Sequence, residues 1–417
     1  MHNENSLYYR DGQLFMDGVS LNAIAERVET PFYCYSSAAI TAQIADCQSA
    51  FQKLGASIHY AVKANSNLSV LRLMADAGLG ADIVSVGELQ RALAAGIQPS
   101  RIIFSGVGKR RSELLAALQA GIFQFNVESL PELQQLADLC RQQGCTAGVS
   151  VRVNPEVDAA THRHITTAIK GSKFGVPLEQ LETALDLIVQ SEALALHGLA
   201  IHLGSQIVDV APYRKACRRL RNLLNDLRQK GYVITHLDLG GGFGIDYGEG
   251  RYLDFHRVAD TFHQELQELN VKIAIEPGRS LVGSAGVLVS EVVYRKEVEP
   301  LPLLILDAGM NDLMRPALYQ AEHRVMPLVE SGRPVETCGV VGPICETTDR
   351  FLQRTDLPAI QAGERVALLQ VGAYGAVMAS AYNSRDMIPE VMVSQNRYRL
   401  IRRRIPQSDL MAYEMDG

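Results

Sequence analysis

The sequence feature that most constrains the fold is a regular alternation between short apolar runs and segments with helical periodicity, from Pro31 to about Arg279. The apolar runs are Ile58–Lys63, Ala81–Ser85, Ile102–Gly106, Ile122–Val127, Gly148–Val153, Leu196–Leu203, His236–Leu239 and Lys272–Glu276. Apolar strands separated by helices predict a parallel sheet covered by helices. Eight such units in about 250 residues predict a TIM barrel, and a doubly wound open sheet is the alternative.

Polar residues and glycines at the carboxyl ends of these runs favour the barrel. They are Lys63, Asp82, Ser85, Ser105, Gly106, Asn126, Glu128, Arg152, Asn154, His202, Ser205, Gly240–Gly242, Glu276 and Arg279. Barrel enzymes place their active sites at the rim formed by these strand ends. We therefore expect a catalytic site at this rim.

The pattern changes after Arg279, where strand-like segments and turns replace the long helices. We expect a barrel over residues 31–279 and a second, mostly β domain that combines residues 1–30 with 280–417. Within the second domain, the basic stretch Arg397–Pro406 alternates with apolar residues and predicts a solvated strand edge.

Composition excludes several classes of protein. With 47% hydrophobic and 21% charged residues the chain is typical of a globular protein, and its net charge of −6 argues against nucleic-acid binding. The seven cysteines are scattered without a CxxC motif, which indicates reduced thiols. No apolar run approaches the length of about 20 residues that spans a bilayer, and the first residues lack the apolar core of a secretory signal. We expect a soluble, cytoplasmic protein that does not bind a membrane.

Lys63 is the first candidate for a functional residue, because it follows a buried strand directly. A lysine there could simply extend its charge to solvent. Alternatively, it could attack an aldehyde and form a Schiff base, a role for which partial burial is favourable.

Other rim residues favour the second role for Lys63. The glycine-rich turn Asp238–Gly244 and the turn Glu276–Ser280 follow the last two runs, where TIM barrels often bind phosphate, although a plain tight turn is also possible. Glu276 is a buried carboxylate that needs a partner, either a pyridinium nitrogen or Arg152. His202 could be a core residue or a ring that stacks on a cofactor. Together these residues predict a pyridoxal 5′-phosphate (PLP) site and no metal site.

The sequence contains, in order and over nearly its whole length, the motifs YAVKAN, HLGSQI, DLGGGFGIDY, EPGRSLV, DAGMNDLMRPALY, GPICETTD and GAYGAVMASAYNSR. In these motifs it resembles the fold-type III PLP-dependent amino-acid decarboxylases. The resemblance implies an N-terminal barrel, a β domain built from both chain ends, and a homodimer with shared active sites. It also implies a substrate, meso-2,6-diaminopimelate, which would be converted to L-lysine and CO₂ in lysine biosynthesis.

The resemblance also implies roles for individual residues. Lys63 would bind PLP covalently, His202 would stack on its ring, and Glu276 would pair with its pyridine nitrogen. The residues implied to hold the phosphate and neighbouring parts of the cofactor are Ser205, Gly241, Gly242, Gly278, Arg279 and Tyr374. Those implied to bind the substrate are Arg279, Arg315, Tyr319, Tyr374 and Glu346, and Cys345 from the other subunit would be the general acid. Asp82 and Arg152 also match the family and would support the site.

The chemistry of decarboxylation agrees with these residue types. Loss of CO₂ leaves a carbanion, for which PLP is an electron sink, and a carboxylate such as Glu276 strengthens that sink by keeping the pyridine nitrogen protonated. A thiol such as Cys345 is a suitable acid for the carbanion, although a cysteine can also be a small buried hydrophobe. Arg279 and Arg315 suit a carboxylate by bidentate hydrogen bonding, and their structural alternative is an ion pair between domains.

Two stretches depart from the family pattern. Thr347 and Thr348 replace a Ser-Gly pair found in many relatives, and the segment Val157–Val176 contains an unusual HRHITTAI. His162 and His164 in that segment suggest a metal site, but without a third ligand at suitable spacing they are better explained as loop residues.

Several other functions are compatible with parts of the pattern. A racemase on this architecture would prefer an arginine opposite the pyridine nitrogen, where this chain has Glu276. Decarboxylases acting on ornithine, lysine, arginine or carboxynorspermidine would lack either the paired arginines or the Cys345–Glu346 pair. A regulatory PLP protein would consist of the barrel alone, and an inactive relative would most simply have lost Lys63 or Cys345.

Overall fold

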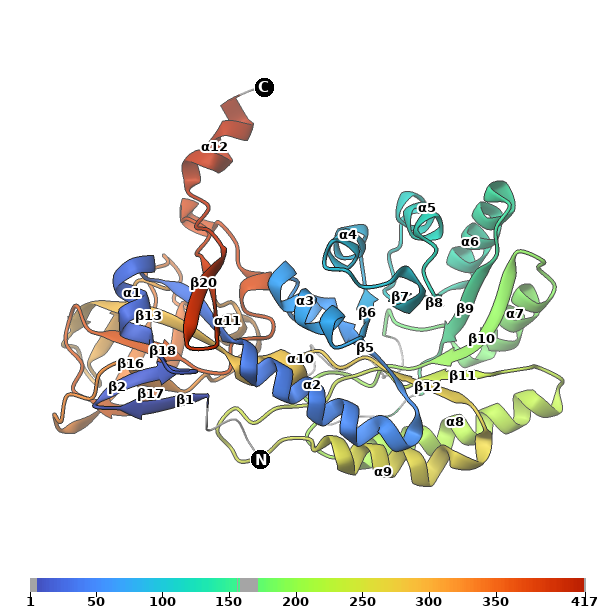
Figure 1. Ribbon diagram of the computed structural model, residues 1–417, viewed down its shortest axis with the longest axis horizontal. Helices are drawn as coiled ribbons and strands as arrows, with labels where there is room; N and C mark the ends of the chain where they lie inside the picture. The colour runs from blue at the N-terminus through green and yellow to red at the C-terminus, as the bar shows by residue number, and fades with distance from the viewer. Residues whose placement is uncertain (1–5, 156, 158–171, 416–417) are drawn as a thin grey trace. The chain divides into compact units, whose positions relative to one another are not determined.

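The computed structural model describes residues 6–155, 157 and 172–415 of the chain (Figure 1). The chain divides into two compact units, and each is described by itself. One unit combines residues 44–245 with 251–280, and the other combines residues 1–43, 246–250 and 281–417.

The first unit is built on a closed barrel of eight parallel strands. The strands are β5 (Ser57–Ala61), β6 (Gly80–Ile83), β7 (Ile102–Phe104), β8 (Gln124–Val127), β9 (Ala147–Arg152), β10 (Leu194–Ala200), β11 (His236–Asp238) and β12 (Lys272–Ile275). They follow one another around the barrel in chain order, and pairing of β12 with β5 closes it. This is the architecture that the alternation of apolar runs and helices predicts.

Helices follow the strands and form the outer layer of the barrel (Figure 1). They are α3 (Leu68–Asp76), α4 (Val86–Ala94), α5 (Arg111–Ala120), α6 (Leu130–Gln143), α7 (Leu178–Val189), α8 (Ala211–Gln229) and α9 (Phe255–Leu266), with α2 (Ser37–Phe51) preceding β5. Several begin at a polar residue whose side chain accepts a hydrogen bond from a backbone N–H of the first turn: Asn67, Ser85, Ser129 and Asp254. Such caps satisfy helix N–H groups that have no partner within the helix.

Backbone hydrogen bonds continue beyond the strands and bring the rim loops together. Glu276 N–H donates to the Gly240 carbonyl at 2.8 Å, and Ala61 N–H donates to the Pro277 carbonyl at 3.0 Å. The glycine-rich turn after β11 therefore lies beside Glu276, and the turn after β12 lies beside the end of β5. Lys63 follows directly in the short 3₁₀ helix η2 (Val62–Ala64).

The second unit is mostly β. A three-stranded sheet is formed by β1 (Leu7–Arg10), β2 (Gln13–Met16) and β3 (Val19–Ser20). The larger, nine-stranded sheet contains β4 (Phe32–Ser36), β13 (Gly286–Lys296), β14 (Leu303–Leu306), β15 (Val325–Pro327), β16 (Val335–Val341), β17 (Arg350–Pro358), β18 (Arg365–Leu368), β19 (Glu390–Ser394) and β20 (Arg397–Arg402). Its short helices are α1 (Leu21–Val28), α10 (Arg279–Val282), which begins in the barrel unit, α11 (Arg315–Tyr319) and α12 (Gln407–Met415).

Both chain ends contribute to the core of this unit. Leu14 and Ile24 from the N-terminal segment are fully buried in one cluster with Val289 and Val391 from the C-terminal segment. The strand β20 pairs only with β19, at one end of the sheet, and is largely exposed, as the basic stretch Arg397–Pro406 predicts. No helix among the described residues is long and apolar enough to cross a membrane.

The fold class predicted from the sequence is confirmed: a TIM barrel and a separate, mostly β unit. The division of the chain differs in detail from the predicted boundaries at residues 31 and 279. Residues 32–36 form β4, which pairs with β13 and β19 of the β unit, and the division falls after Gln43. An apolar strand that precedes a helix has the same pattern in either unit, so its pairing partners could not be predicted.

Candidate active site

Lys63 has a buried carboxylate as its partner at the barrel rim. Its Nζ donates to Asp82 Oδ2 at 2.5 Å, and Asp82 is fully buried at the end of β6 while the Lys63 side chain is 33% exposed. The other oxygen, Asp82 Oδ1, has no hydrogen-bond partner in the described part of the chain. The lysine is thus held by an ion pair and keeps access to solvent, so it does not simply extend its charge away from the protein.

Glu276 and His202 lie close together at the same rim. Glu276 Oε2 is 4.0 Å from His202 Nδ1, and both residues follow the ends of their strands. Burial lowers the pKa of His202 well below its usual value, and the positive charges of Arg152 and Lys63 lower it further. His202 Nδ1 accepts a hydrogen bond from Gly241 N–H at 3.4 Å. The ring is therefore neutral, with its proton on Nε2.

The glycines of the rim turns are required by close backbone packing. A Cβ at Gly241 would lie 2.0 Å from the Glu276 carbonyl oxygen, and one at Gly242 would lie 2.3 Å from the Gly204 carbonyl oxygen. Gly242 also has a φ of +93°, which side chains of L residues disfavour. At Gly278 a Cβ would come within 3.0 Å of the Ala61 Cβ, close to Lys63. The glycines therefore allow the rim turns to pack directly against neighbouring backbone.

Ser205 and Arg279 are brought together at this rim. Arg279 Nη2 donates to Ser205 Oγ at 3.0 Å, and Arg279 is only 7% exposed. A guanidinium and a hydroxyl side by side form a suitable place for an anionic group.

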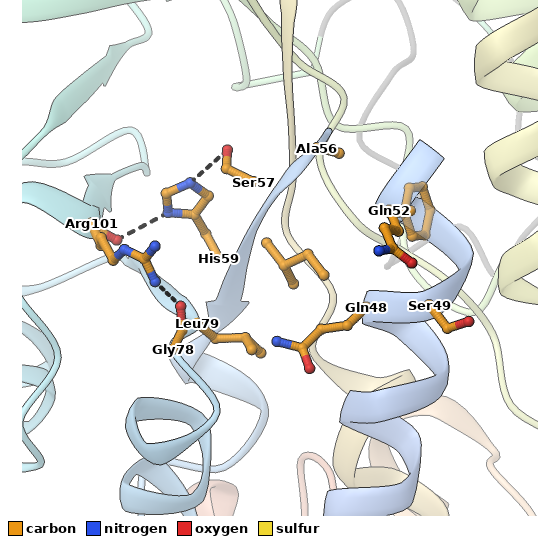
Figure 2. A pocket seen from close by; sticks show the side chains of 12 residues that line it. Gln48, Ser49, Gln52, Ala56, Ser57, His59, Gly78, Leu79 and Arg101 are labelled. Atoms are coloured by element: carbon orange, nitrogen blue, oxygen red, sulfur yellow. Dashed lines mark hydrogen bonds between the residues drawn. The ribbon is translucent and has the colours of Figure 1, made fainter. Parts of the chain in front are cut away.

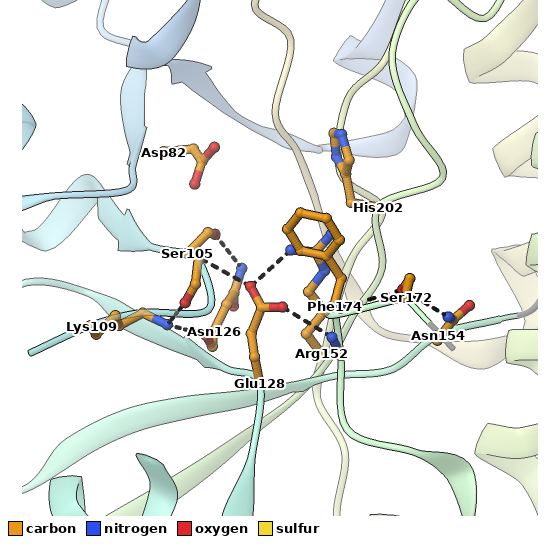
Figure 3. Close-up of polar contacts among 12 residues, drawn as sticks. Asp82, Ser105, Lys109, Asn126, Glu128, Arg152, Asn154, Ser172, Phe174 and His202 are labelled. Atoms are coloured by element: carbon orange, nitrogen blue, oxygen red, sulfur yellow. Dashed lines mark hydrogen bonds and ion pairs between the residues drawn. The ribbon is translucent and has the colours of Figure 1, made fainter. Parts of the chain in front are cut away.

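Arg152 does not pair with Glu276, which was the structural alternative for that carboxylate. Arg152 Nη1 instead donates to Glu128 Oε1 at 2.8 Å, in an ion pair whose side chains are 10% and 1% exposed (Figure 3). Glu128 also accepts hydrogen bonds from the backbone N–H groups of Gly106 and Gly175, both at 3.0 Å. The partner of Arg152 is thus Glu128, at the end of the adjacent strand.

Two buried residues beside Glu276 were not predicted as site residues. Asn126 Nδ2 donates to Asp238 Oδ2 at 3.0 Å and lies 3.4 Å from Glu276 Oε1. Asn126 was identified as a polar rim residue without a role, and Asp238 was considered only as the start of the glycine-rich turn. The sequence signal for both was their position at a strand end, which does not show what they contact.

In the β unit, Arg315 is fixed by groups from two other segments. Its Nη1 donates to His323 Nε2 at 2.8 Å, and its guanidinium lies 4.6 Å from the ring centre of Tyr247. His323 Nδ1 in turn donates to the Leu369 carbonyl at 2.7 Å. These contacts hold the arginine in one orientation, as recognition of a planar carboxylate requires.

Cys345 and Glu346 are exposed on a loop of the β unit that Asp349 organises. Asp349 accepts hydrogen bonds from Ile344 N–H at 2.6 Å and from Met310 N–H at 2.7 Å.

Tyr382 and Asp349 were not predicted as site residues. The Tyr382 hydroxyl donates to Glu346 Oε1 at 2.7 Å, which orients that carboxylate.

The remaining predicted site residues of the β unit are Tyr319, at the end of α11, and Tyr374, and both are half-buried. Tyr374 has a φ of 56°, an unusual value for a tyrosine. His162 and His164 lie outside the described residues. In the described ranges no group of three or more His, Cys, Asp or Glu residues could hold a metal ion.

A cavity of about 460 Å³ lies at the opposite end of the barrel strands (Figure 2). It is lined by residues at the start of β5 and β6, including His59, which contacts Ser57 Oγ at 3.1 Å and the Arg101 carbonyl at 3.0 Å. Burial lowers the pKa of His59 to about 4. Because catalytic groups of TIM barrels lie at the carboxyl ends of the strands, we assign this cavity no part in the candidate active site.

The groups at the rim fit PLP. The cofactor needs an amine for its aldehyde, a partner for its pyridine nitrogen and an anion site for its phosphate. Lys63, Glu276 and the Ser205–Arg279 pair are of these types, and the glycine-rich turns expose backbone N–H groups that can approach an anion. The barrel and its rim thus define a PLP-binding enzyme.

Comparison with known proteins leads to the same class. Residues 37–283 match the model of the pyridoxal-dependent decarboxylase family, pyridoxal binding domain. The diaminopimelate decarboxylase of Aquifex aeolicus is 42% identical over 95% of this chain and 94% of its own length. The diaminopimelate decarboxylase of Neisseria meningitidis is 43% identical over 96% of this chain and 99% of its own length. The structure of the Helicobacter pylori diaminopimelate decarboxylase complexed with L-lysine is similar with a TM-score of 0.92, at 39% identity over 95% of this chain and 99% of that chain. The chain therefore belongs to the PLP-dependent decarboxylase family.

The buried ion pair of the rim gives a prediction for stability. We expect Arg152→Ala to destabilise the protein by about 3–5 kcal/mol, because it leaves the Glu128 charge buried without its partner. A matched control is Arg141→Ala, which removes the Arg141–Asp138 ion pair, whose side chains are 57% and 44% exposed. Its expected cost is below about 1 kcal/mol. Urea-induced unfolding followed by circular dichroism measures both, and equal shifts would contradict the structural role of Arg152.

Proposed function

We propose that the protein decarboxylates meso-2,6-diaminopimelate to L-lysine and CO₂, with PLP bound at the barrel rim. The observation that carries this proposal is that Lys63, His202 and Glu276 lie at one rim in a chain whose relatives are named diaminopimelate decarboxylase. The L-lysine in the complexes of the H. pylori and M. jannaschii enzymes supports lysine as the product.

The barrel residues bind and orient the cofactor in this proposal. When bound, PLP supplies an electron sink for the carbanion that loss of CO₂ leaves at Cα. Lys63 is the attachment point, and Asp82 holds its amine in place. The ring of His202 would pack against the pyridine ring, and Glu276 would form a hydrogen bond with the pyridine nitrogen.

The phosphate is assigned to Ser205, to the turns containing Gly241, Gly242 and Gly278, and to Tyr374. Backbone N–H groups of such turns can approach an anion closely because no Cβ intervenes. The contact between Arg279 and Ser205 supports an anion site at this part of the rim.

Four residues are proposed to bind the substrate. Arg279, Arg315 and Tyr319 bind a carboxylate, and Glu346 pairs with the ammonium group at the far end of the substrate. The contacts of Arg315 with His323 and Tyr247, and of Glu346 with Tyr382, support these roles because they fix the charged groups in one orientation.

Cys345 is proposed to donate a proton to Cα after CO₂ has left. Cys345 is exposed on the loop that hydrogen bonds to Asp349 hold in place, and this exposure supports a role in another subunit's active site. We therefore propose a homodimer in which each site combines Lys63 of one chain with Cys345 and Glu346 of the other. A cytoplasmic location is the one that fits a biosynthetic enzyme with free thiols.

The substrate is tested by CO₂ release from the purified, PLP-loaded protein. We expect release from meso-diaminopimelate and none from ornithine, L-lysine, D-lysine or arginine, because only the first has a second carboxylate beside its distal ammonium group. Release from one of the other amino acids would contradict the proposed substrate and leave the reaction type intact. Release from none of them would contradict the decarboxylase function.

The shared site is tested by mixing two inactive variants, Lys63→Ala and Cys345→Ala. In a mixed dimer one of the two sites has both residues intact. With random exchange, half of the dimers are mixed, so we expect about one quarter of the wild-type activity to return. Mass spectrometry of the mixture shows whether subunits have exchanged. Absence of activity in a mixture with proven exchange would contradict the shared site.

A further inference from the structure

Asp238, which has no role in the function proposed above, is buried beside Glu276 and is well supplied with hydrogen-bond donors. It lies at the end of β11 and is 2% exposed. Gly240 N–H donates to Oδ1 at 3.0 Å and Asn126 Nδ2 donates to Oδ2 at 3.0 Å. A donor at each oxygen stabilises the negative charge of a buried carboxylate.

Glu276 is 6% exposed and has much weaker donors. Its Oε1 lies 3.4 Å from both Asn126 Nδ2 and Ser105 Oγ. Its Oε2 is 4.0 Å from His202 Nδ1, a nitrogen that accepts a hydrogen bond from Gly241 and so has no proton to donate. Of the two neighbouring carboxyl groups, Glu276 is therefore the one for which the neutral, protonated form is more favourable.

The orientation of Asn126 is fixed from its other side. Its Oδ1 accepts a hydrogen bond from Gln124 Nε2 at 2.8 Å, so its Nδ2 must face the carboxyl groups. Gln124 Oε1 in turn is 3.1 Å from His197 Nδ1. Burial, together with the charges of His236 and Lys272, lowers the pKa of His197 to about 4. His197 is thus neutral near neutral pH and donates from Nδ1 to Gln124.

We propose that Asp238 is a positioning residue whose charge keeps one proton on Glu276 in the cofactor-free barrel, and that Glu276 gives this proton to the pyridine nitrogen when PLP binds. In this transfer the O–H bond of Glu276 breaks and an N–H bond forms at the nitrogen. Glu276 becomes the carboxylate that pairs with the resulting cation. The inference rests on the proposed function, because it takes Glu276 as the partner of the pyridine nitrogen.

The charges that face Glu276 favour its neutral form. Burial raises the pKa of Glu276 well above its usual value, the charges of Asp238 and Asp82 raise it further, and Lys63 opposes them. Burial also raises the pKa of Asp238, but its hydrogen bonds with Glu276, Asn126 and Gly240 act in the opposite direction. Two adjacent buried carboxyl groups cannot both ionise cheaply, so they share one proton. Since the pKa of Glu276 is raised, Glu276 stays protonated to a higher pH than an ordinary glutamate.

The basic groups at the rim do not provide a positive charge that would stabilise an ionised Glu276 in place of the proton. The charge of Arg152 on β9 is taken up by Glu128, and that of Lys63 is shared with Asp82. The neutral ring of His202 provides no charge. When Glu276 is neutral, Asp238 is the anion of this carboxyl pair, and hydrogen bonds from Asn126 and Gly240 stabilise it.

The proton on Glu276 is tested by infrared spectroscopy of the cofactor-free protein near neutral pH. We expect the wild type to show a carbonyl band of a protonated carboxylic acid that Glu276→Gln lacks, and addition of PLP to abolish that band. In Asp238→Asn the cofactor-free band should disappear at a lower pH than in the wild type, because loss of the Asp238 charge lowers the pKa of Glu276. The matched control is Ser150→Ala, a fully buried residue paired in register with Asn126, and it should keep the band.

A second measurement counts the protons taken up when PLP binds, by titration calorimetry in buffers of different ionisation enthalpy. At a pH at which Glu276 has ionised in Asp238→Asn but not in the wild type, the variant should take up more protons per PLP, up to about one, because its Glu276 has none to give. Equal proton uptake in the two proteins would overturn the transfer.

The infrared results separate this inference from the proposed function. A wild-type spectrum without the acid band, a band that persists after PLP is bound, or a band whose pH dependence is unchanged in Asp238→Asn would each overturn the inference. If Asp238→Asn does not fold, the wild type and Glu276→Gln still decide whether Glu276 is protonated and loses its proton. Failure of the wild type to develop visible absorbance with PLP would overturn the proposed function and the transfer with it.

Discussion

The closed barrel removes its interior side chains from water, and each ionisable group at its rim must therefore find a partner within the barrel. Arg152 forms an ion pair with Glu128 at the end of the adjacent strand, and Lys63, which follows β5, forms one with Asp82 of the adjacent strand β6. Among the described rim residues, Glu276 and its neighbour Asp238 form no ion pair with a lysine or arginine. A buried carboxyl group in this position is suited to a partner that the protein does not itself contain, such as a pyridine nitrogen.

The same constraint connects the strand pattern with the chemistry. Parallel strands end at one rim, and the short turns after them bring polar side chains from distant parts of the chain within contact. The glycines after β11 allow the turn to pack directly on the backbone at Glu276 and at Gly204. The positions of His202 and Glu276 therefore follow from the barrel, and burial is the main cause that lowers the pKa of His202 and raises that of Glu276.

The sequence predicted the barrel and its rim because both depend on local features: apolar runs, helical periodicity and polar strand ends. It did not predict the partner of Arg152, because that depends on the register of β8 and β9, which pairs Val127 with Val151. The role of Asp238 was missed because it begins a glycine-rich turn, where a carboxylate resembles an ordinary turn residue. Likewise, the pairing of β4 with β13 and β19 could not be predicted, because these strands are far away in the sequence.

The central claim is that Lys63 is the point at which the barrel rim holds PLP. The most direct test is to reduce the PLP-loaded protein with sodium borohydride, digest it and locate the phosphopyridoxyl group by mass spectrometry. The account predicts the group on the peptide that contains Lys63 and on no other lysine. A phosphopyridoxyl group on a different lysine, or none on any peptide, would contradict it.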